Sequence, residues 1–402
     1  MGWTGALPDS LVSERGGKIV LLIADGLGGL PHPETGLTEL ETARTPNLDA
    51  LAAEGATGLH IPIAPGITPG SGPAHMGLFG YDPVEYLIGR GVLEGLGIGF
   101  ELNEGDVAVR INFATVDGTG NITDRRAGRI STELCEELSA RLDTIELPGV
   151  ELFFRPVKEH RAVLVLRGDG LVGDLNDTDP QATGVPPRAV SATRPEEERT
   201  AELLNAFIAK AREMLADQPK ANAITMRGIA ARTKIPGFVE RYGLRAAVIA
   251  GYPMYRGVGG LVGMDVLPVA GPPEAKTLML AEHWEEYDFF FVHYKYTDSR
   301  GEDGDFDAKV QATEEFDTIV PGVRTMRPDV LLVTGDHSTP SALASHSWHP
   351  VPIALVSPST RRDGSTSFGE TQCLGGALGL LRAVDLMPLM LAHAGRLAKF
   401  GA

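Results

Sequence analysis

Short, unbroken runs of aliphatic and β-branched residues recur along the chain and lead into Gly, Asp or His. They span residues 18–24, 244–251, 289–293, 330–334 and 353–357. Continuous apolar runs of this length are typical of strands that are buried on both faces. Because helical stretches separate several of these runs, the pattern predicts a mostly parallel sheet flanked by helices, and the fold class is α/β.

Polar residues stand at the ends of several of these predicted strands. In open α/β sheets, ligands bind at the carboxyl ends of the strands. Those ends carry Asp25, Asp298, Asp336 and His337. We therefore expect side chains that are distant in sequence to meet in one crevice.

The pattern changes in the middle of the chain and predicts an inserted domain. Residues 107–113 and 162–166 look like strands, and residues 132–142 look like an amphipathic helix. Residues 176–187 are rich in Asp, Thr, Pro and Gly, which is typical of a linker that leads back. The expected division is a main domain of residues 1–103 and 188–402 and a smaller α+β domain of residues 104–187.

Composition adds limits on partners and location. The chain has 402 residues, of which 43% are hydrophobic and 22% are charged, so two cores are expected and disorder is not. The net charge of −17 disfavours nucleic acid and membrane surfaces as partners. Cys135 and Cys373 are too few for a disulfide framework. Residues 1–17 lack the pattern of a signal peptide, and no apolar run has membrane-spanning length, so we expect a cytoplasmic protein.

Two short motifs in the first part of the chain carry candidate chemistry. Asp25 ends the first predicted strand and Gly26 permits the following turn, although a turn or helix-cap aspartate has the same pattern. Ser71 stands in Gly-Ser-Gly-Pro, where Gly72 and Pro73 fit the cap and first residue of a helix. A helix N-terminus stabilises an alkoxide or an attached phosphate, but the motif also occurs in ordinary loops.

Two later segments supply the metal-type side chains. The loop after the strand at 287–292 is rich in carboxylates, which suit a hard cation or form a solvated acidic loop. The sharper signal is the buried strand that delivers Asp336 and His337 together, with His346 nine residues beyond His337. This loop region supplies mixed oxygen and nitrogen ligands for a divalent metal.

The order of these motifs resembles the alkaline-phosphatase superfamily, and within it the archaeal-type 2,3-bisphosphoglycerate-independent phosphoglycerate mutases. The resemblance extends over nearly the whole chain. It is carried by Ala24-Asp25-Gly26, Gly70-Ser71, Gly80-Tyr81-Asp82-Pro83, Asn112-Phe113-Ala114-Thr115, Asp124-Arg125-Arg126-Ala127-Gly128-Arg129, Tyr252-Pro253-Met254 and Gly335-Asp336-His337-Ser338-Thr339-Pro340.

The resemblance implies two divalent metal ions and no bisphosphoglycerate cofactor. One ion would be held by Asp25, Ser71, Asp336 and His337, and the other by Asp298 and His346. The family has a His four residues after the position of Asp298, whereas this chain has Glu302. Because an extra carboxylate hardens the donor set, we expect Mn²⁺ first, with Mg²⁺, Co²⁺ or Zn²⁺ as alternatives.

The activity implied by the resemblance is the interconversion of 3-phosphoglycerate and 2-phosphoglycerate, a glycolytic isomerase reaction on a small phosphorylated carboxylate. Ser71 would be the nucleophile that carries the phosphoryl group, and Asp117 or Asp124 would be the general acid/base. The inserted domain would act as a lid that excludes water. Substrate contacts are expected from His75, Arg125, Arg126, Arg129 and Arg241.

Other interpretations of the same motifs stay open at this point. The arginines of the segment 125–129 are also compatible with an exposed basic cluster, and His75 with a packing role in its helix. The superfamily shares its core among several chemistries. A metal-dependent phosphomonoesterase or phosphonate hydrolase is the alternative enzyme, and a ligand-sensing protein without catalysis is the alternative of another class.

Overall fold

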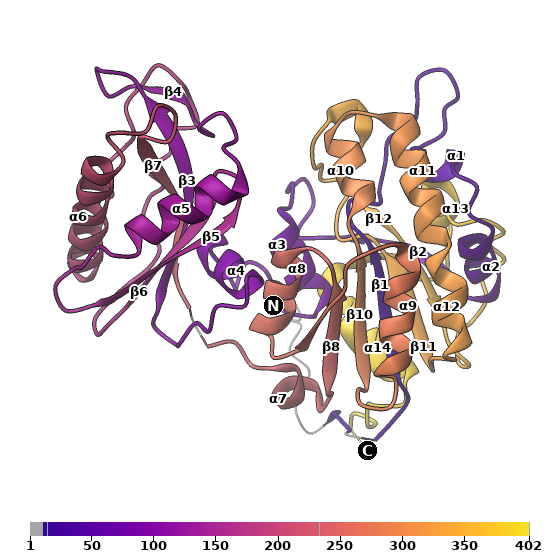
Figure 1. The fold of residues 1–402 in the computed structure, drawn as a ribbon. Helices are drawn as coiled ribbons and strands as arrows, with labels where there is room; N and C mark the ends of the chain where they lie inside the picture. Colours follow the sequence, from indigo (N-terminus) through magenta and orange to yellow (C-terminus); the bar gives the residue numbers. More distant parts are fainter. Residues whose placement is uncertain (1–10, 14, 233, 402) are drawn as a thin grey trace. The chain divides into compact units, whose positions relative to one another are not determined.

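The computed structural model describes residues 11–13, 15–232 and 234–401, which fall into two compact units. Unit 1 consists of the chain up to Leu87 and from Ile235 onward, and unit 2 consists of Ile88–Lys234. In Figure 1, unit 2 is drawn in violet to rose and unit 1 in the indigo, orange and yellow of the two ends of the sequence. Unit 2 is thus an insertion in the sequence of unit 1.

Unit 1 is built on an eight-stranded sheet with the strand order β13-β2-β12-β11-β1-β10-β8-β9. Strand β1 runs parallel to both β10 and β11, whereas β12 runs antiparallel to β11 and β2. The mostly parallel α/β sheet predicted from the sequence is confirmed. The strands are β1 (Ile19–Ala24), β2 (Ala56–Ile61), β8 (Ala246–Ala250), β9 (Asp265–Pro268), β10 (Phe289–Tyr294), β11 (Val330–Thr334), β12 (Val351–Val356) and β13 (Gly379–Arg382).

Helices cover both faces of this sheet and bury its continuous apolar strands. All six residues of β1 are fully buried, which explains why its sequence does not alternate between apolar and polar residues. One core cluster packs α2, α9, α11 and α12 against a single face. The helices of unit 1 are α1 (Glu39–Thr42), α2 (Pro46–Glu54), α3 (Ser71–Leu78), α7 (Phe238–Tyr242), α8 (Pro253–Leu261), α9 (Pro273–Glu282), α10 (Tyr296–Glu302), α11 (Phe306–Asp317), α12 (Ile319–Thr325), α13 (Glu370–Leu374) and α14 (Leu386–His393).

Unit 2 is an antiparallel sheet with three helices. Strand β3 (Val107–Val116) pairs with β4 (Ile122–Asp124), β6 (Arg161–Arg167) and β7 (Ala223–Ala231), and β6 pairs with β5 (Glu151–Lys158). The helices are α4 (Arg90–Gly97), α5 (Thr132–Leu142) and α6 (Glu198–Met214). The helix predicted at residues 132–142 is confirmed as α5, and the strands predicted at 107–113 and 162–166 lie within β3 and β6.

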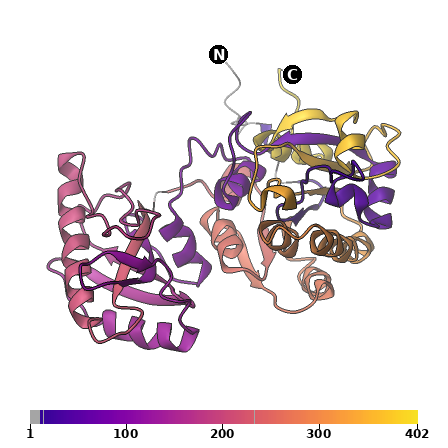
Figure 2. The ribbon, with the colours of Figure 1, turned by 90° about the horizontal axis from the view of Figure 1, so that it is seen from above.

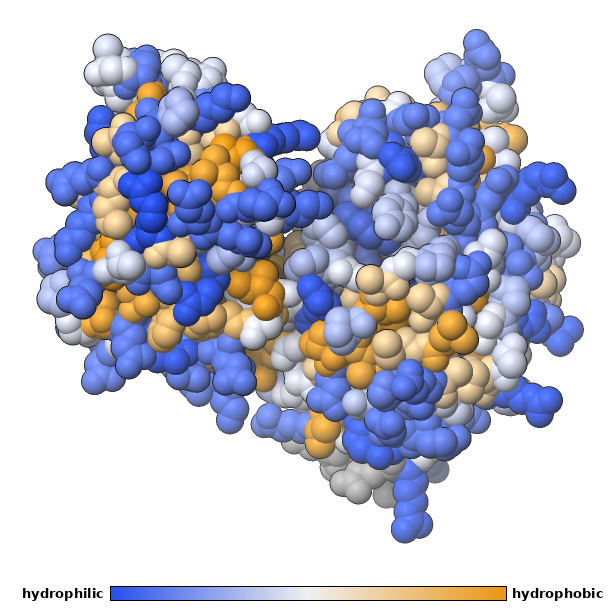
Figure 3. Space-filling view, viewed as in Figure 1, coloured by the Kyte–Doolittle hydropathy of each residue, from blue (hydrophilic) through white to orange (hydrophobic). Residues whose placement is uncertain are grey.

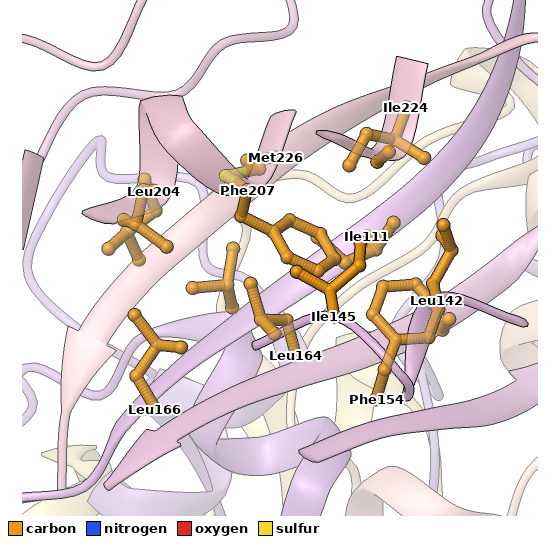
Figure 4. Packing of buried hydrophobic residues seen from close by; sticks show 14 of the residues in the cluster. Ile111, Leu142, Ile145, Phe154, Leu164, Leu166, Leu204, Phe207, Ile224 and Met226 are labelled. Atoms are coloured by element: carbon orange, nitrogen blue, oxygen red, sulfur yellow. The ribbon is translucent and has the colours of Figure 1, made fainter. Parts of the chain in front are cut away.

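The two faces of the unit 2 sheet differ in chemistry. Val107, Val109, Ile111 and Phe113 of β3 point into a core that α5 and α6 complete. Figure 4 shows Phe207 of α6 in this core, where its ring stacks on that of Phe154 at a centroid distance of 5.7 Å. Figures 1 and 2 place α4 on the side of the sheet opposite α6. The alternate residues of β3 therefore lie on the face that α4 covers.

The boundaries of the insertion differ from the sequence prediction of residues 104–187. The structure begins unit 2 at Ile88 and ends it at Lys234. Helix α4 belongs to unit 2 because it packs on β3 and β7, and β7 belongs there because it pairs with β3 along most of its length. The sequence-based prediction ended too early since a strand that returns to a sheet after a long helix carries no local signal of its partner.

The helices and the surface concern the expectation that no segment spans a membrane. Among the described residues, no helix is long and apolar enough to cross a membrane. Figure 3 shows that hydrophilic residues cover most of the visible face, with hydrophobic residues in smaller patches. Residues 1–10, which belong to the segment where no signal peptide is predicted, lie outside the described residues.

We predict that Phe207→Ala lowers the free energy of unfolding by about 3–5 kcal/mol, because it removes a fully buried ring and leaves a cavity beside Phe154. Urea unfolding followed by circular dichroism measures the change. Glu202→Ala, at an exposed position of the same helix, is the control and is expected to shift stability by less than about 0.5 kcal/mol. Equal effects of the two substitutions would contradict this account of the core.

Candidate functional site

Three neighbouring strands of unit 1 end in acidic or imidazole side chains. Asp25 follows β1, Asp298 lies in α10 just after β10, and Asp336 and His337 follow β11. Because β1 lies between β10 and β11 and is parallel to both, these ends share one edge of the sheet. The structure thus brings together the residues that the sequence predicted to meet. We call Asp25, Asp298, Asp336, His337 and His346 the strand-end cluster.

The strand-end cluster contains two overlapping groups with metal-ligand geometry. In the first group, ligand atoms of Asp25, Asp336 and His337 all lie within 4.8 Å of one another. His337 Nε2 is 3.2 Å from Asp336 Oδ2 and 3.4 Å from Asp25 Oδ1. In the second group, Asp298, His337 and His346 meet the same limit, and His346 Nε2 is 3.4 Å from Asp298 Oδ1.

The buried carboxylates of this cluster fit divalent cations. Both carboxylate oxygens of Asp25 and Oδ2 of Asp336 are buried, and among the described residues none of the three accepts a hydrogen bond of good geometry. Buried carboxylate oxygens without donors are costly unless a cation neutralises them. Lys295 Nζ, 3.2 Å from Asp25 Oδ2, supplies one positive charge to three buried aspartates. Divalent cations would supply the remainder of the charge.

The pKa values of the acidic residues follow from the neighbouring cations. Burial raises the pKa of Asp25, but the charge of Lys295 and the neighbouring His293 lower it more, so the pKa lies well below its ordinary value. Burial and Asp25 raise the pKa of Asp298, whereas His346 and Lys295 lower it to about 2. Both carboxylates are therefore ionised at neutral pH, as metal ligands must be.

Ser71 faces this cluster from the first turn of α3. Its Oγ lies 3.2 Å from His337 Nε2. The helix begins at Ser71 with Gly70 as its cap, two residues before the start predicted at Pro73. Pro73, the third residue of the helix, is tolerated within the first turn because the first N–H groups of a helix have no intrahelical partner. Ser71 therefore stands where the helix dipole favours negative charge.

A buried lysine ties together the two loops that carry the first group of ligands. Lys309 of α11 is fully buried, and its Nζ donates to Gly28 O at 2.9 Å and to Thr339 O at 2.8 Å. Thr339 Oγ1 in turn donates to Asp298 Oδ1 at 2.7 Å. Gly26 has a φ of +63°, and a side chain there would meet Thr339 Oγ1 at 2.5 Å. The ligand positions are thus fixed by contacts that lie outside the cluster.

His75 lies in a buried aromatic layer and not on an open surface. Its Nδ1 is 2.8 Å from Ser71 O and 3.2 Å from Asp336 Oδ2. Its ring packs against Tyr255 and His293, and those two rings stack at 3.7 Å. His293 Nε2 is 3.3 Å from Asp25 Oδ2. This position differs from the expected phosphate contact and indicates that His75 supports Ser71 and Asp336 from behind.

Glu302 and Arg241 have different environments. Glu302 ends the helix that carries Asp298, and its Oε1 lies 3.7 Å from His346 Nε2, with the side chain 55% exposed. It is beside the second ligand group without belonging to it. Arg241 donates to Gly80 O and to the hydroxyl of Tyr242, and it stacks on the ring of Tyr81. Arg241 is thus half-buried and engaged by neighbours within unit 1, and a phosphate contact from it stays a prediction.

Unit 2 contains a strongly basic cavity of about 340 Å³. We call it the arginine pocket. Its lining combines positive charge with few competing carboxylates, which suits an anionic ligand. The lining residues are Arg110, Asn112, Arg125, Arg126, Arg129, Glu159, His160, Arg161 and Arg227.

The segment 124–129 contributes three of the predicted arginines to this pocket. Arg125 makes a bidentate ion pair with Asp179 at 2.8 and 2.9 Å, whereas Arg126 and Arg129 are exposed. Asp124 shapes the segment by accepting the N–H groups of Arg126 and Gly128. The sequence-predicted Arg motif thus does line a cavity, with Arg125 largely committed to Asp179.

The two candidate acid/base residues are separate from the pocket lining. Asp117 is exposed in a turn and accepts hydrogen bonds from Thr119 and Asn121. The hydrogen bond from Thr119 is the main cause of a lowered pKa for Asp117. Asp124 is less exposed and orders the segment that lines the pocket.

Several residues at both places are not predicted from the sequence. In unit 1 these are Lys295 and Lys309, which contact Asp25 and the carbonyls of Gly28 and Thr339, all far away in the sequence. In unit 2 they are Arg110, Arg161 and Arg227. A signal for Arg110 was present, because Arg110 and Asn112 interrupt a strand of apolar residues at alternate positions.

Comparisons with known proteins agree on one family. A model of 2,3-bisphosphoglycerate-independent phosphoglycerate mutase matches residues 52–221. The chain is 49% identical, over 98% of each chain, to a probable mutase of this name from Thermus thermophilus. It is 50% identical, again over 98% of each chain, to one from Deinococcus radiodurans.

Solved structures also resemble this chain along its length. A cofactor-independent phosphoglycerate mutase from Thermoplasma acidophilum matches with a TM-score of 0.73 and 32% identity over 94% of this chain and 100% of that chain. A protein from Pyrococcus horikoshii matches with a TM-score of 0.84 and 31% identity over 96% of this chain and 100% of that chain.

Proposed function

This chain belongs to the 2,3-bisphosphoglycerate-independent phosphoglycerate mutase family, and we propose that it interconverts 3-phosphoglycerate and 2-phosphoglycerate without a bisphosphoglycerate cofactor. The observation that carries the proposal is the position of Ser71 Oγ, 3.2 Å from His337 Nε2 in a cluster of buried aspartates. A serine at a helix N-terminus beside such a cluster is suited to accept and return a phosphoryl group.

The proposed reaction has two transfers that use the same oxygen of this chain. Ser71 Oγ loses its proton and attacks the phosphorus of 3-phosphoglycerate, and the bond between phosphorus and the 3-oxygen breaks. The glycerate takes up a proton on that oxygen and turns within the site. Its 2-hydroxyl then loses a proton and attacks the phosphoserine, which returns Ser71 and gives 2-phosphoglycerate.

Asp25, Asp336 and His337 would hold one divalent cation, and Asp298 and His346 a second, with Ser71 and Glu302 at the margins of the two sets. Bound cations would supply Lewis-acid stabilisation of the phosphoryl oxygens and of the seryl oxygen. We propose Mn²⁺ as the physiological ion, because carboxylates outnumber imidazoles among these residues.

Unit 2 would bind the carboxylate of the substrate and restrict access of water. The arginine pocket supports this role, since Arg126 and Arg129 line it with guanidinium groups that bind carboxylates in bidentate fashion. Asp117 and Asp124 are both proposed as the general acid/base, since each carboxylate accepts hydrogen bonds from its own turn; Asp124 lies in the segment that lines the pocket.

We also propose a cytoplasmic location. Cys135 and Cys373 are both free and buried, which suits a reducing compartment.

We predict that the purified, Mn²⁺-loaded protein converts 3-phosphoglycerate in an enolase-coupled assay without added bisphosphoglycerate and without release of inorganic phosphate. Ser71→Ala is expected to lower the rate about a thousandfold or more, because the phosphoryl acceptor is lost. Ser345→Ala, at an exposed serine outside the strand-end cluster, is the control. Release of phosphate without mutase activity would instead indicate a phosphatase, and full activity of Ser71→Ala would exclude the phosphoserine mechanism.

A second prediction concerns metal binding and stability. Mn²⁺ at about 100 times its dissociation constant is expected to stabilise the native protein by about 2.7 kcal/mol. Asp336→Asn should remove most of this gain, because the substitution weakens a ligand that is fully buried in the cluster. Thermal unfolding with and without Mn²⁺ provides the measurement. Asp303→Asn, at a position 62% exposed beside the same site, should retain the gain, and a loss there would argue against a specific site.

A third prediction concerns Glu302, which stands where the family has His. Glu302→His is expected to be tolerated and to shift selectivity from Mn²⁺ toward Zn²⁺, because an imidazole replaces a hard oxygen donor beside His346. Competitive calorimetric titration with the two ions measures the selectivity. An unchanged ratio of the two affinities would show that Glu302 does not contact the second ion.

A further inference from the structure

We propose that Glu94 is a positioning residue of the arginine pocket. It holds the guanidinium group of Arg110 in the orientation that binds the anionic ligand. The inference rests on the proposed function, in which this pocket binds the substrate carboxylate. Glu94 is not predicted from the sequence, and it lies on α4, outside the segment that carries the Arg motif.

Strand pairing places positive charges side by side on one face of the unit 2 sheet. Arg110 of β3 is directly opposite Arg227 of β7, and Asn112 of β3 is opposite Arg161 of β6. Like charges directly opposite each other on a sheet are destabilising. The core does not need this arrangement, because the apolar residues of β3 point to the other face. A ligand-binding role accounts for it.

Helix α4 covers this face at very short range and delivers one carboxylate to it. A side chain at Gly91 would meet Ala108 O at 2.3 Å, so the helix backbone packs directly on β3. Glu94, one turn later, has its Oε1 3.4 Å from Arg110 Nε. The two side chains are 13% and 17% exposed, respectively. The ion pair is therefore well shielded from solvent.

The electrostatics show that Glu94 and Arg110 depend on each other. Burial raises the pKa of Glu94, and the charge of Arg110 is the largest influence that lowers it. Burial likewise lowers the pKa of Arg110, and Glu94 raises it, whereas Arg90, Arg161 and Arg227 lower it further. Without Glu94, Arg110 would be repelled by its arginine neighbours.

Arg110 can bind a ligand while its guanidinium group is paired with Glu94. The contact with Glu94 is an ion pair at Nε and not a hydrogen bond, and it leaves the terminal nitrogens of Arg110 outside the pair. Arg110 also lines the pocket itself. The pair therefore resembles other sites where a buried carboxylate fixes the orientation of a binding side chain.

The test measures binding of 3-phosphoglycerate by calorimetry to the Mn²⁺-loaded full chain carrying Ser71→Ala, so that no turnover occurs. Adding Glu94→Gln, which keeps the side-chain size, is expected to weaken binding about tenfold. In the active protein the same substitution should raise KM by a similar factor and change kcat little. Glu136→Gln, an equal change of charge at an exposed position of α5, is the control and should leave binding unchanged.

A double-mutant cycle with Arg110→Gln separates positioning from a general effect on charge. If Glu94 acts through Arg110, Glu94→Gln should weaken binding much less in the Arg110→Gln background. Unchanged or tighter binding with Glu94→Gln, or equal effects in both backgrounds, would overturn the proposal. These outcomes are distinct from failure of the proposed function, which would show as absence of mutase activity in the unsubstituted protein.

Discussion

The main constraint on unit 1 is the electrostatic repulsion among buried carboxylates at the ends of three adjacent parallel strands. Asp25, Asp298 and Asp336 are each at most 1% exposed, and the protein supplies few cations to balance them. Negative charges in such a place are costly unless positive charge is added. The fold therefore creates the demand for divalent cations, and the helices and loops around the cluster hold the ligands in place.

The protein meets part of that demand with its own lysines. Lys295 contacts the carboxylates of Asp25 and Asp298, and Lys309 fixes the loops by binding two backbone carbonyls. Lys309 is fully buried and Lys295 is 21% exposed, and both reach partners that are distant in the sequence. Ser71, the proposed nucleophile, is presented to this cluster by the first turn of a helix, where negative charge is favoured.

Unit 2 also brings like charges close together, but there the charges are positive. Arg110, Arg161 and Arg227 crowd on one face of an antiparallel sheet. Glu94 supplies a carboxylate to Arg110 from the helix above, and Asp177 and Asp179 pair with Arg227. A negatively charged ligand in one unit and positively charged ions in the other would each relieve a repulsion that the fold builds in. A phosphorylated carboxylate that needs metal ions for transfer matches both demands.

The sequence by itself determined the α/β class, the buried strands and the residues at their ends, because unbroken apolar runs and Asp-Gly or Asp-His steps are local patterns. Its motifs also indicated the family. Only the tertiary structure decided the limits of unit 2, the contacts of Arg241, and the partners of Lys309, Arg110 and Glu94. These depend on which strands pair and which helix covers which face, and such contacts join residues far apart in the chain, where no local pattern records them.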